Sequence, residues 1–250
     1  INEASRQWAT RPSDQRFTTL EDLLHYKSTQ RELSSTIDID PGKLPIRSKG
    51  DPARGELAVG MKQGDAFFTN WSFGQLCGLA GAPASYLRTL PSPMTKDLLD
   101  YGLKFGDRAE QDKGVRFLVT GEPDNRTARA FTSQTYGRIW DSEVVDTVVE
   151  LNNRQEGRWK VPLASYTSQD PLRATTLYAS DRDVFMFLVD PDRPVDGGGP
   201  NDQLFRGFIV SNSEVGAATF TLLTFLYRYV CDNRIIWGTK DISQLTIRHS

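Results

Sequence analysis

The sequence predicts an α+β fold: an antiparallel, meandering sheet packed against a long apolar helix, with an N-terminal helical subdomain. Apolar residues recur at helical spacing across residues 70–106, and from Val115 the spacing changes to the two-residue period of strands. The stretch from Glu214 to Tyr229 would carry nonpolar side chains nearly all round a helix, which is typical of a helix buried in a core. Because helices and strands are separated along the chain, α+β is favoured over alternating α/β.

Composition limits the possible functions. The chain has 250 residues, 38% of them hydrophobic, which is enough to bury a core. Its 30 basic and 32 acidic side chains give a net charge of −2, so nucleic acid would have to be held by a local patch. No apolar stretch is long enough to cross a bilayer, and we expect no membrane association. Cys77 and Cys231 lie far apart in apolar patterns, which favours reduced thiols in a cytoplasmic protein.

Residues 1–69 are predicted to form an N-terminal helix and an extended arm. Leucines at helical spacing follow a capping Thr19, and they predict a helix from Thr19 to Arg31. Prolines and glycines punctuate the stretch from Ser34 to Arg54, which indicates an arm that wraps a surface. This region is therefore expected to be peripheral.

Residues 70–250 are predicted to form the α+β core, with a helical segment at 70–106 and the sheet and central helix at 115–238. Prolines after glycine breaks divide the helical segment into an αα-hairpin series. A DNA-reading helix-turn-helix is disfavoured there, since the second helix lacks a basic face. The chain starts at Ile1 and stops without a terminating signal, so we expect a truncated C-terminus and a longer polypeptide.

Strands are predicted in two runs. In the first run, VRFLVT and RTARAF flank the turn GEPDN as a hairpin, TYGRIW (residues 135–140) adds a third strand, and Asp141 caps an amphipathic helix from Ser142 to Asn152. The second run comprises RWKVPLASY, ATTLYAS, DVFMFLVD and LFRGFIVS. The last two segments are apolar on both faces, so they are expected to be central strands.

The polar step before the long apolar helix is interpreted as structural. Ser211 followed three residues later by Glu214 has the spacing of a capping box, in which side chain and backbone bond reciprocally. The residues assigned to this structural motif are Ser211, Asn212, Ser213, Glu214, Gly216, Cys231, Asn233 and Trp237.

Catalysis finds little support in the sequence. Ser213 or Cys231 could act as a nucleophile, but the only histidines, His25 and His249, lie near the chain ends. No HExxH or CxxC spacing is present, and Asp181, Asp183 and Asp190 are the remaining candidate metal ligands. The glycines at 197–199 lack the Lys-Ser/Thr of a phosphate loop. We therefore expect no catalytic residue, no metal and no cofactor.

Basic and aromatic residues alternate on the predicted strands, and Tyr136, Arg138 and Trp140 are expected to share one face of theirs. In such a pattern, rings can stack on unpaired bases while cations hold phosphates, which is how single-strand binders work. The alternative, in which the rings are core and the charges solvated, stays open. The candidate nucleic-acid-binding residues are Arg129, Arg138, Arg158, Lys160, Tyr136, Trp140 and Trp159.

Several stretches together resemble the phage/plasmid-like protein family, a domain of unknown function. They are WATRPSDQRFTTLEDLL, WSFGQLCGLAGAPASYLRTLP, ARAFTSQTYGRIWDSEVV, LYASDRDVFMFLVD and RGFIVSNSEVGAATFTLLTFLYRYVCDNRIIWG. The resemblance implies a protein of phages, prophages or plasmids in the cytoplasm of a bacterial host, without an established activity. A fainter similarity of topology connects the chain with ring-forming single-strand annealing proteins.

Two functions are therefore carried forward. The first is a homo-oligomeric protein of a phage or mobile element that binds single-stranded DNA in replication or recombination, with strand annealing as one role. The alternative is a protein-binding module, either a counter-defence factor or an assembly scaffold, that engages a host protein through the arm and the glycine-rich loop around Pro194. The near-neutral charge favours the alternative. An enzyme is a third hypothesis.

Overall fold

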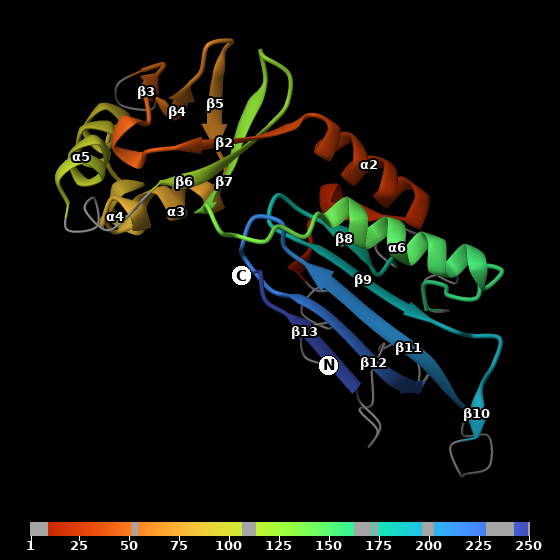
Figure 1. The fold of residues 1–250 in the computed structure, drawn as a ribbon. Coiled ribbons are helices and arrows are strands. Elements are labelled where there is room, and N and C mark those ends of the chain that lie inside the picture. The colour runs from red at the N-terminus through yellow and green to blue at the C-terminus, as the bar shows by residue number, and fades with distance from the viewer. Residues whose placement is uncertain are drawn as a thin grey trace. The chain divides into compact units, whose positions relative to one another are not determined.

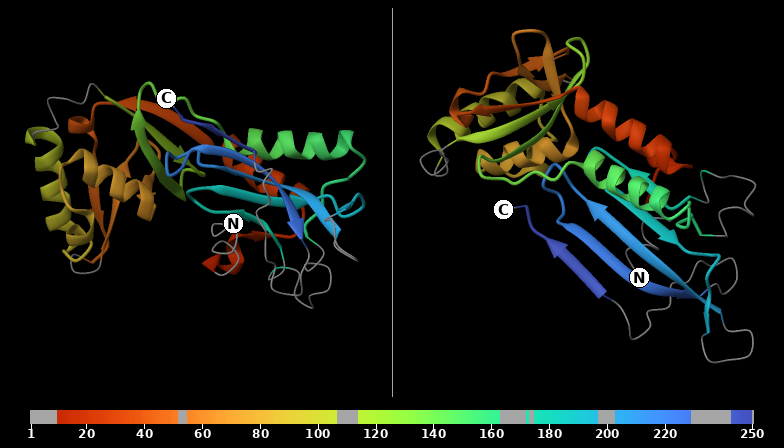
Figure 2. Two further views of the ribbon diagram at one scale, coloured as in Figure 1. Left: turned by 90° about the horizontal axis from the view of Figure 1, so that it is seen from below. Right: turned by 45° about the vertical axis from the view of Figure 1, so that its right-hand side comes forward.

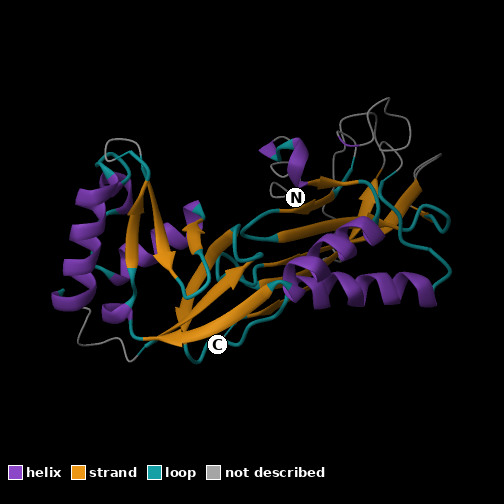
Figure 3. Cartoon of the chain, turned by 90° about the horizontal axis from the view of Figure 1, so that it is seen from above, coloured by secondary structure: helices purple, strands orange, loops and turns teal. Residues whose placement is uncertain are grey.

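The computed structural model describes residues 10–51, 55–106, 114–162, 172, 175–196, 203–228 and 243–249 (Figure 1). Helices and mainly antiparallel strands confirm the α+β class, and Figure 3 shows both kinds of element. The chain divides into two compact units. The first unit comprises Ile1–Ser28 and Arg138–His249, and the second comprises Thr29–Gly137 with Ser250. These boundaries do not coincide with the predicted one after residue 69.

The second unit is built on a six-stranded sheet with the order β2-β6-β7-β5-β4-β3. Only β5 and β7 are parallel; the other neighbouring pairs are antiparallel. The predicted arm is wrong, because its residues form β2 and β3, and the prolines and glycines only separate these short strands. The strands are β2 Ser34–Ile39, β3 Ile46–Lys49, β4 Glu56–Gly60, β5 Asp65–Phe68, β6 Val115–Thr120 and β7 Arg126–Ser133.

Helices of the second unit confirm the predicted helical segment. They are α3 Asn70–Leu79, α4 Ala84–Leu87 and α5 Ser92–Phe105, and the short η2 Pro41–Lys43 precedes them. A capping box starts α3: Ser72 N donates to Thr69 Oγ1, and Thr69 N donates to Ser72 Oγ, each at 3.0 Å. Phe117 and Phe131 stack in the core with ring centroids 4.9 Å apart. The β6–β7 hairpin is also confirmed.

The first unit contains a seven-stranded antiparallel sheet with the order β1-β8-β9-β11-β12-β13, in which β10 also pairs with β11. The predicted central strands DVFMFLVD and LFRGFIVS are confirmed as β9 and β11, which are neighbours in the middle of the sheet. The strands are β1 Arg16–Phe17, β8 Leu177–Ala179, β9 Val184–Val189, β10 Val195–Asp196, β11 Gln203–Asn212, β12 Phe220–Arg228 and β13 Ser243–Ile247, and the short η1 Ser13–Gln15 precedes β1.

Two helices cover one face of this sheet. The helices α2 Leu20–Glu32 and α6 Asp141–Arg154 lie side by side over β8, β9 and β11 (Figures 1 and 2). The first leucines of α2 and the valines of α6 pack with Met186 and Val210 of the sheet. On the opposite face, Phe187, Ile209 and Phe225 belong to a second apolar cluster. The central strands are thus buried on both faces.

The long apolar helix predicted from Glu214 to Tyr229 is wrong. After a turn in which Gly216 has a φ of +83°, the segment forms strand β12, paired with β11 and β13. A strand apolar on both faces has the same composition as a helix apolar all round, so periodicity cannot separate them. Thr221, Thr224 and Phe225 are residue types that favour strands.

Two smaller predictions before α6 also need correction. TYGRIW forms no strand, because the chain turns at Gln134–Thr135 and then continues to α6 without regular secondary structure. The predicted helix Ser142–Asn152 is confirmed as α6, but Asp141 does not cap it. Asp141 is the first helical residue, and the N-cap Trp140 makes no side-chain capping bond.

Within the described residues, no helix has the length and nonpolar character needed to span a membrane.

Candidate functional site

An open apolar groove of about 820 Å³ lies in the first unit between α6 and the strands β11 and β12. Nonpolar side chains dominate its lining, with Glu143 and Arg206 as the charged members and Thr147 and Thr224 as further polar ones. Such a surface is suited to a nonpolar partner, since burial of apolar area contributes roughly 25 cal/mol per Å². The other lining residues are Ile139, Val144, Val148, Leu151, Trp159, Val195, Gly207, Phe208, Val210, Phe220, Leu222, Phe225, Leu226 and Ile247.

The groove exists because the helices cover only part of the sheet. Val144 and Val148 of α6 point inward and are buried. Val210 of β11 pairs with Leu222 of β12, and Leu222 pairs with Leu245 of β13, so one apolar face continues across all three strands. Figure 1 shows β12 and β13 extending beyond the helices. Among the described residues, no helix covers that extension.

Strand β13 is the outer edge of the sheet, and no strand in the described ranges pairs with its far side. All five of its residues are exposed, including Leu245 (51%) and Ile247 (44%) on the groove face. Other edges carry charges that discourage pairing: Asp38 on β2, and Arg47 with Lys49 on β3. The strand β13 contains neither a charge nor a proline, so its edge can accept another strand.

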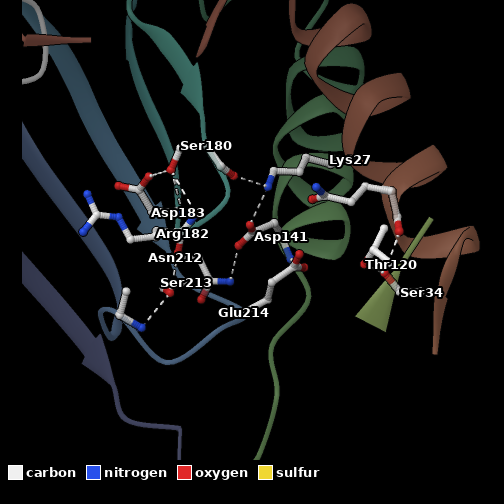
Figure 4. Close-up of polar contacts among 12 residues, drawn as sticks. Lys27, Ser34, Thr120, Asp141, Ser180, Arg182, Asp183, Asn212, Ser213 and Glu214 are labelled. Atoms are coloured by element: carbon white, nitrogen blue, oxygen red, sulfur yellow. Dashed lines mark hydrogen bonds and ion pairs between the residues drawn. The ribbon is translucent and has the colours of Figure 1, made fainter. Parts of the chain in front are cut away.

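A buried polar cluster holds the start of α6 against the sheet (Figure 4). Lys27 Nζ lies 2.9 Å from Asp141 Oδ2, and both side chains are at most 1% exposed. Lys27 also donates to the Ser180 carbonyl at 3.2 Å. Asn212 Nδ2 donates to Asp141 Oδ1 at 2.8 Å, and Asp141 N donates to Glu214 Oε2 at 3.0 Å. The cluster therefore ties α2, α6 and the end of β11 together.

Burial in this cluster disfavours the charged form of the Asp141 carboxyl group. Burial raises the pKa of the Asp141 carboxyl to about 6, the Lys27 cation opposes that rise, and the nearby Glu214 carboxylate adds to it. The position of both carboxylates at the N-terminus of α6 is favourable, because the helix presents unpaired N–H groups there.

A second hydrogen-bonded set fixes the turn between β8 and β9. Ser180 Oγ donates to Asp183 Oδ1 at 2.6 Å, and Arg11 Nη2 lies 2.5 Å from Asp183 Oδ2. Burial raises the pKa of Asp183, but the hydrogen bond and charge of Arg11 outweigh it and leave the pKa below its usual value. Ser213 Oγ donates to the Arg182 carbonyl at 2.5 Å and accepts from Ala217 N at 2.9 Å. These contacts stabilise the turn between β8 and β9 and attach it to the end of β11.

The described part of the chain contains no activated nucleophile and no cluster of metal ligands. The Ser213 hydroxyl is buried and engaged with backbone groups. Cys77 is buried, and burial raises the pKa of its thiol to about 11, which suppresses the thiolate. No group of His, Cys, Asp and Glu side chains able to hold a metal ion occurs among the described residues.

The predicted nucleic-acid-binding residues are divided between the two units. Arg129 and Tyr136 belong to the second unit, and the other five belong to the first. Arg129 is 2% exposed and sits at a bulge of β7, where Ala128 and Ala130 face successive residues of β6. The single strand face assumed for Tyr136, Arg138 and Trp140 does not exist, because these residues lie outside any strand.

In the first unit, carboxylates accompany the candidate cations Arg158 and Lys160. Arg158 Nε donates to Asp190 Oδ2 at 2.6 Å, and Lys160 Nζ lies 2.9 Å from Asp192 Oδ2. Trp159 meets Phe208 edge-on with ring centroids 4.8 Å apart, and it lines the groove.

Arg138 and Trp140 lie together just before α6. Arg138 Nη1 donates to the Glu214 carbonyl, and its guanidinium lies 5.6 Å from the Trp140 ring centroid. Binding of nucleic acid by these residues stays a prediction.

The structural motif predicted around Ser211 and Glu214 makes other hydrogen bonds than those expected from the sequence. The capping box of Ser211 and Glu214 is wrong, because Ser211 lies within β11, and a turn and then strand β12 follow it in place of a helix. Glu214 instead accepts from the first N–H of α6. Gly216 supplies the positive φ of the turn before β12. Cys231, Asn233 and Trp237 lie outside the described residues.

Sequence reasoning missed the groove and Lys27. The groove was hidden when β12 was assigned as a helix, although the threonines of that segment were a strand signal. Lys27 gave no signal, because a lysine within a helix is normally solvated and its partner Asp141 is distant in sequence.

Comparison of the chain with protein-family models, with curated proteins and with solved structures found no match. The resemblance to the phage/plasmid-like family therefore stays a prediction.

Proposed function

We propose that the protein is a protein-binding module that receives an extended segment of its partner along β13. The observation that carries this proposal is the uncharged open edge of β13 beside an apolar groove, with Ile247 belonging to both. A strand added to β13 would bond to its outward backbone groups and direct alternate side chains toward the groove face.

Partner chemistry follows from the two faces of β13. Leu245 and Ile247 lie on the groove face, and Gln244 and Thr246 lie on the other. The partner segment should therefore alternate nonpolar and polar residues. Full burial of a leucine or isoleucine contributes about 1.5–3 kcal/mol, and these two start roughly half exposed, so each would contribute about half of that.

Charge supports a protein partner over single-stranded nucleic acid. Among the described residues that line the groove, Arg206 is the only basic one. Arg158 and Lys160 are each neutralised by a carboxylate, and a phosphate would have to displace it. In a phage or plasmid setting, such a module would serve as a counter-defence factor or an assembly scaffold.

Selection from a phage-displayed library of random linear peptides tests this proposal. The wild-type protein should enrich peptides with nonpolar residues at alternate positions. Thr147 is an exposed residue of α6 that lines the groove, and Thr147→Trp would place a large ring in it. This variant should weaken peptide binding at least about tenfold, or 1.4 kcal/mol. Asp146→Trp is the matched control, because Asp146 is exposed but does not line the groove. Failure to enrich peptides, or equal binding to both variants, would count against the groove.

A labelled oligo-dT tests the competing function. We expect no rise in fluorescence anisotropy when protein is added at low salt, because the groove lining is apolar and Arg158 and Lys160 are paired. Binding that weakens with salt at a log–log slope of about −0.7 per phosphate contact would replace the proposed function with single-strand binding. In that case Arg158→Ala should lower the slope.

A further inference from the structure

Helix α5 in the second unit exposes a continuous nonpolar stripe. Met94, Leu98, Tyr101 and Phe105 are 54%, 45%, 66% and 71% exposed, and they follow one another at intervals of four, three and four residues. We call these four residues the α5 stripe. The opposite side of α5, which includes Leu99 and Leu103, is buried in the core of the unit. Both faces of this helix are thus nonpolar.

The spacing of the α5 stripe fits a second helix. Intervals of four, three and four residues are those of the d, a, d and a positions of a coiled-coil heptad. Scattered exposed nonpolar residues are normal on proteins, but a contiguous stripe of large ones usually marks an interaction surface. Asp97 and Lys104 flank it with one charge of each sign, whereas a helix that lies on an anionic membrane has a basic polar face.

We propose that the α5 stripe docks on the α5 stripe of a second copy of the chain, with the two helices antiparallel across a two-fold axis. In that arrangement Leu98 packs against Tyr101 of the second copy, and Met94 packs against Phe105 of the second copy. Each large side chain then meets a nonpolar partner, and the contact repeats itself by symmetry.

Charge complementarity selects the antiparallel orientation. Asp97 and Lys104 are exposed and lie seven residues apart, so they fall on the same flank of the stripe. An antiparallel pair sets this flank against the same flank of the second copy, which places Asp97 near Lys104 twice. A parallel two-fold pair would set it against the opposite flank, where Thr95 and Gly102 are buried.

The size of the stripe sets the expected affinity. Four side chains on one helix bury less than a standard interface, and association must overcome the loss of rotational and translational freedom. We therefore expect a reversible dimer with a Kd on the order of 1–100 µM.

Sedimentation equilibrium over a concentration series that spans this range tests the contact. The wild-type protein should approach twice its 28.1 kDa mass, and Leu98→Asp should stay at 28.1 kDa while keeping the wild-type circular dichroism and melting curve. Leu151→Asp is the matched control, an exposed leucine on a helix of the first unit, and it should dimerise. A monomeric wild type, or a dimeric Leu98→Asp, would overturn the proposal.

Charge reversal tests the orientation. Asp97→Lys and Lys104→Asp should each raise the dimer Kd about two- to tenfold, because like charges would then meet twice. The double variant Asp97→Lys/Lys104→Asp should return to the wild-type Kd, and additive weakening would overturn the antiparallel pairing. The dimer does not depend on the groove: Leu98→Asp should retain peptide binding, and Thr147→Trp should retain the dimer.

Discussion

Replacement of Lys27 by methionine is expected to lower the free energy of unfolding by about 3–5 kcal/mol at pH 7. The substitution leaves the Asp141 carboxylate fully buried beside Glu214 without its cation, 2.9 Å away in the wild type. The cost arises from an uncompensated buried charge, so it exceeds the value of the ion pair itself. Urea denaturation of both proteins measures it as a shift of the midpoint.

Lys160→Met supplies the matched control for this measurement. The Lys160–Asp192 pair has the same 2.9 Å separation but is 42% and 65% exposed, so its loss should cost about 1 kcal/mol or less. The double variant Lys27→Met/Asp141→Leu should recover much of the stability lost in Lys27→Met, because it removes both buried charges. Equal losses for Lys27→Met and Lys160→Met would show that burial of the Lys27–Asp141 pair has no energetic consequence.

Local signals explain how far the sequence could predict the fold. The β6–β7 hairpin, α2, α6 and the central strands β9 and β11 were predictable because turn residues and side-chain periods act over a few residues. β12 was not predictable from its period, because nonpolar side chains on both of its faces erase the alternation that marks a strand.

Long-range contacts explain what the sequence could not reveal about the candidate site. The groove forms because α6 lies over β11 and leaves β12 and β13 uncovered. No local sequence pattern encodes that placement of the helix. Likewise, the sequence gives no sign that Arg158 and Lys160 pair with carboxylates 32 residues away, those of Asp190 and Asp192. Pairing of charges is decided by the tertiary fold.

The raised pKa of Asp141 predicts how stability changes between about pH 4 and pH 6. In this window the folded state keeps a proton on Asp141 that the unfolded state, with an ordinary pKa near 3.8, has released. The stabilisation is therefore complete below that value and is lost as pH rises through about 6. At about 1.4 kcal/mol per pKa unit, the loss amounts to at most about 3 kcal/mol.

Urea denaturation at a series of pH values separates Asp141 from the other carboxyl groups. Asp141→Asn should flatten the fall in stability between pH 4 and 6, whereas Asp192→Asn, at an exposed carboxylate, should keep it. Asp183 has the opposite effect, because its lowered pKa contributes stability at higher pH. That contribution is lost only as pH falls through the pKa of Asp183 in the folded state. Lys27→Met should move the window to higher pH, because the cation that opposes the rise in the Asp141 pKa is gone. A stability profile that rises between pH 4 and 6 in the wild type, or one unchanged in Asp141→Asn, would mean that Asp141 is ionised throughout and that Lys27 fully offsets its burial.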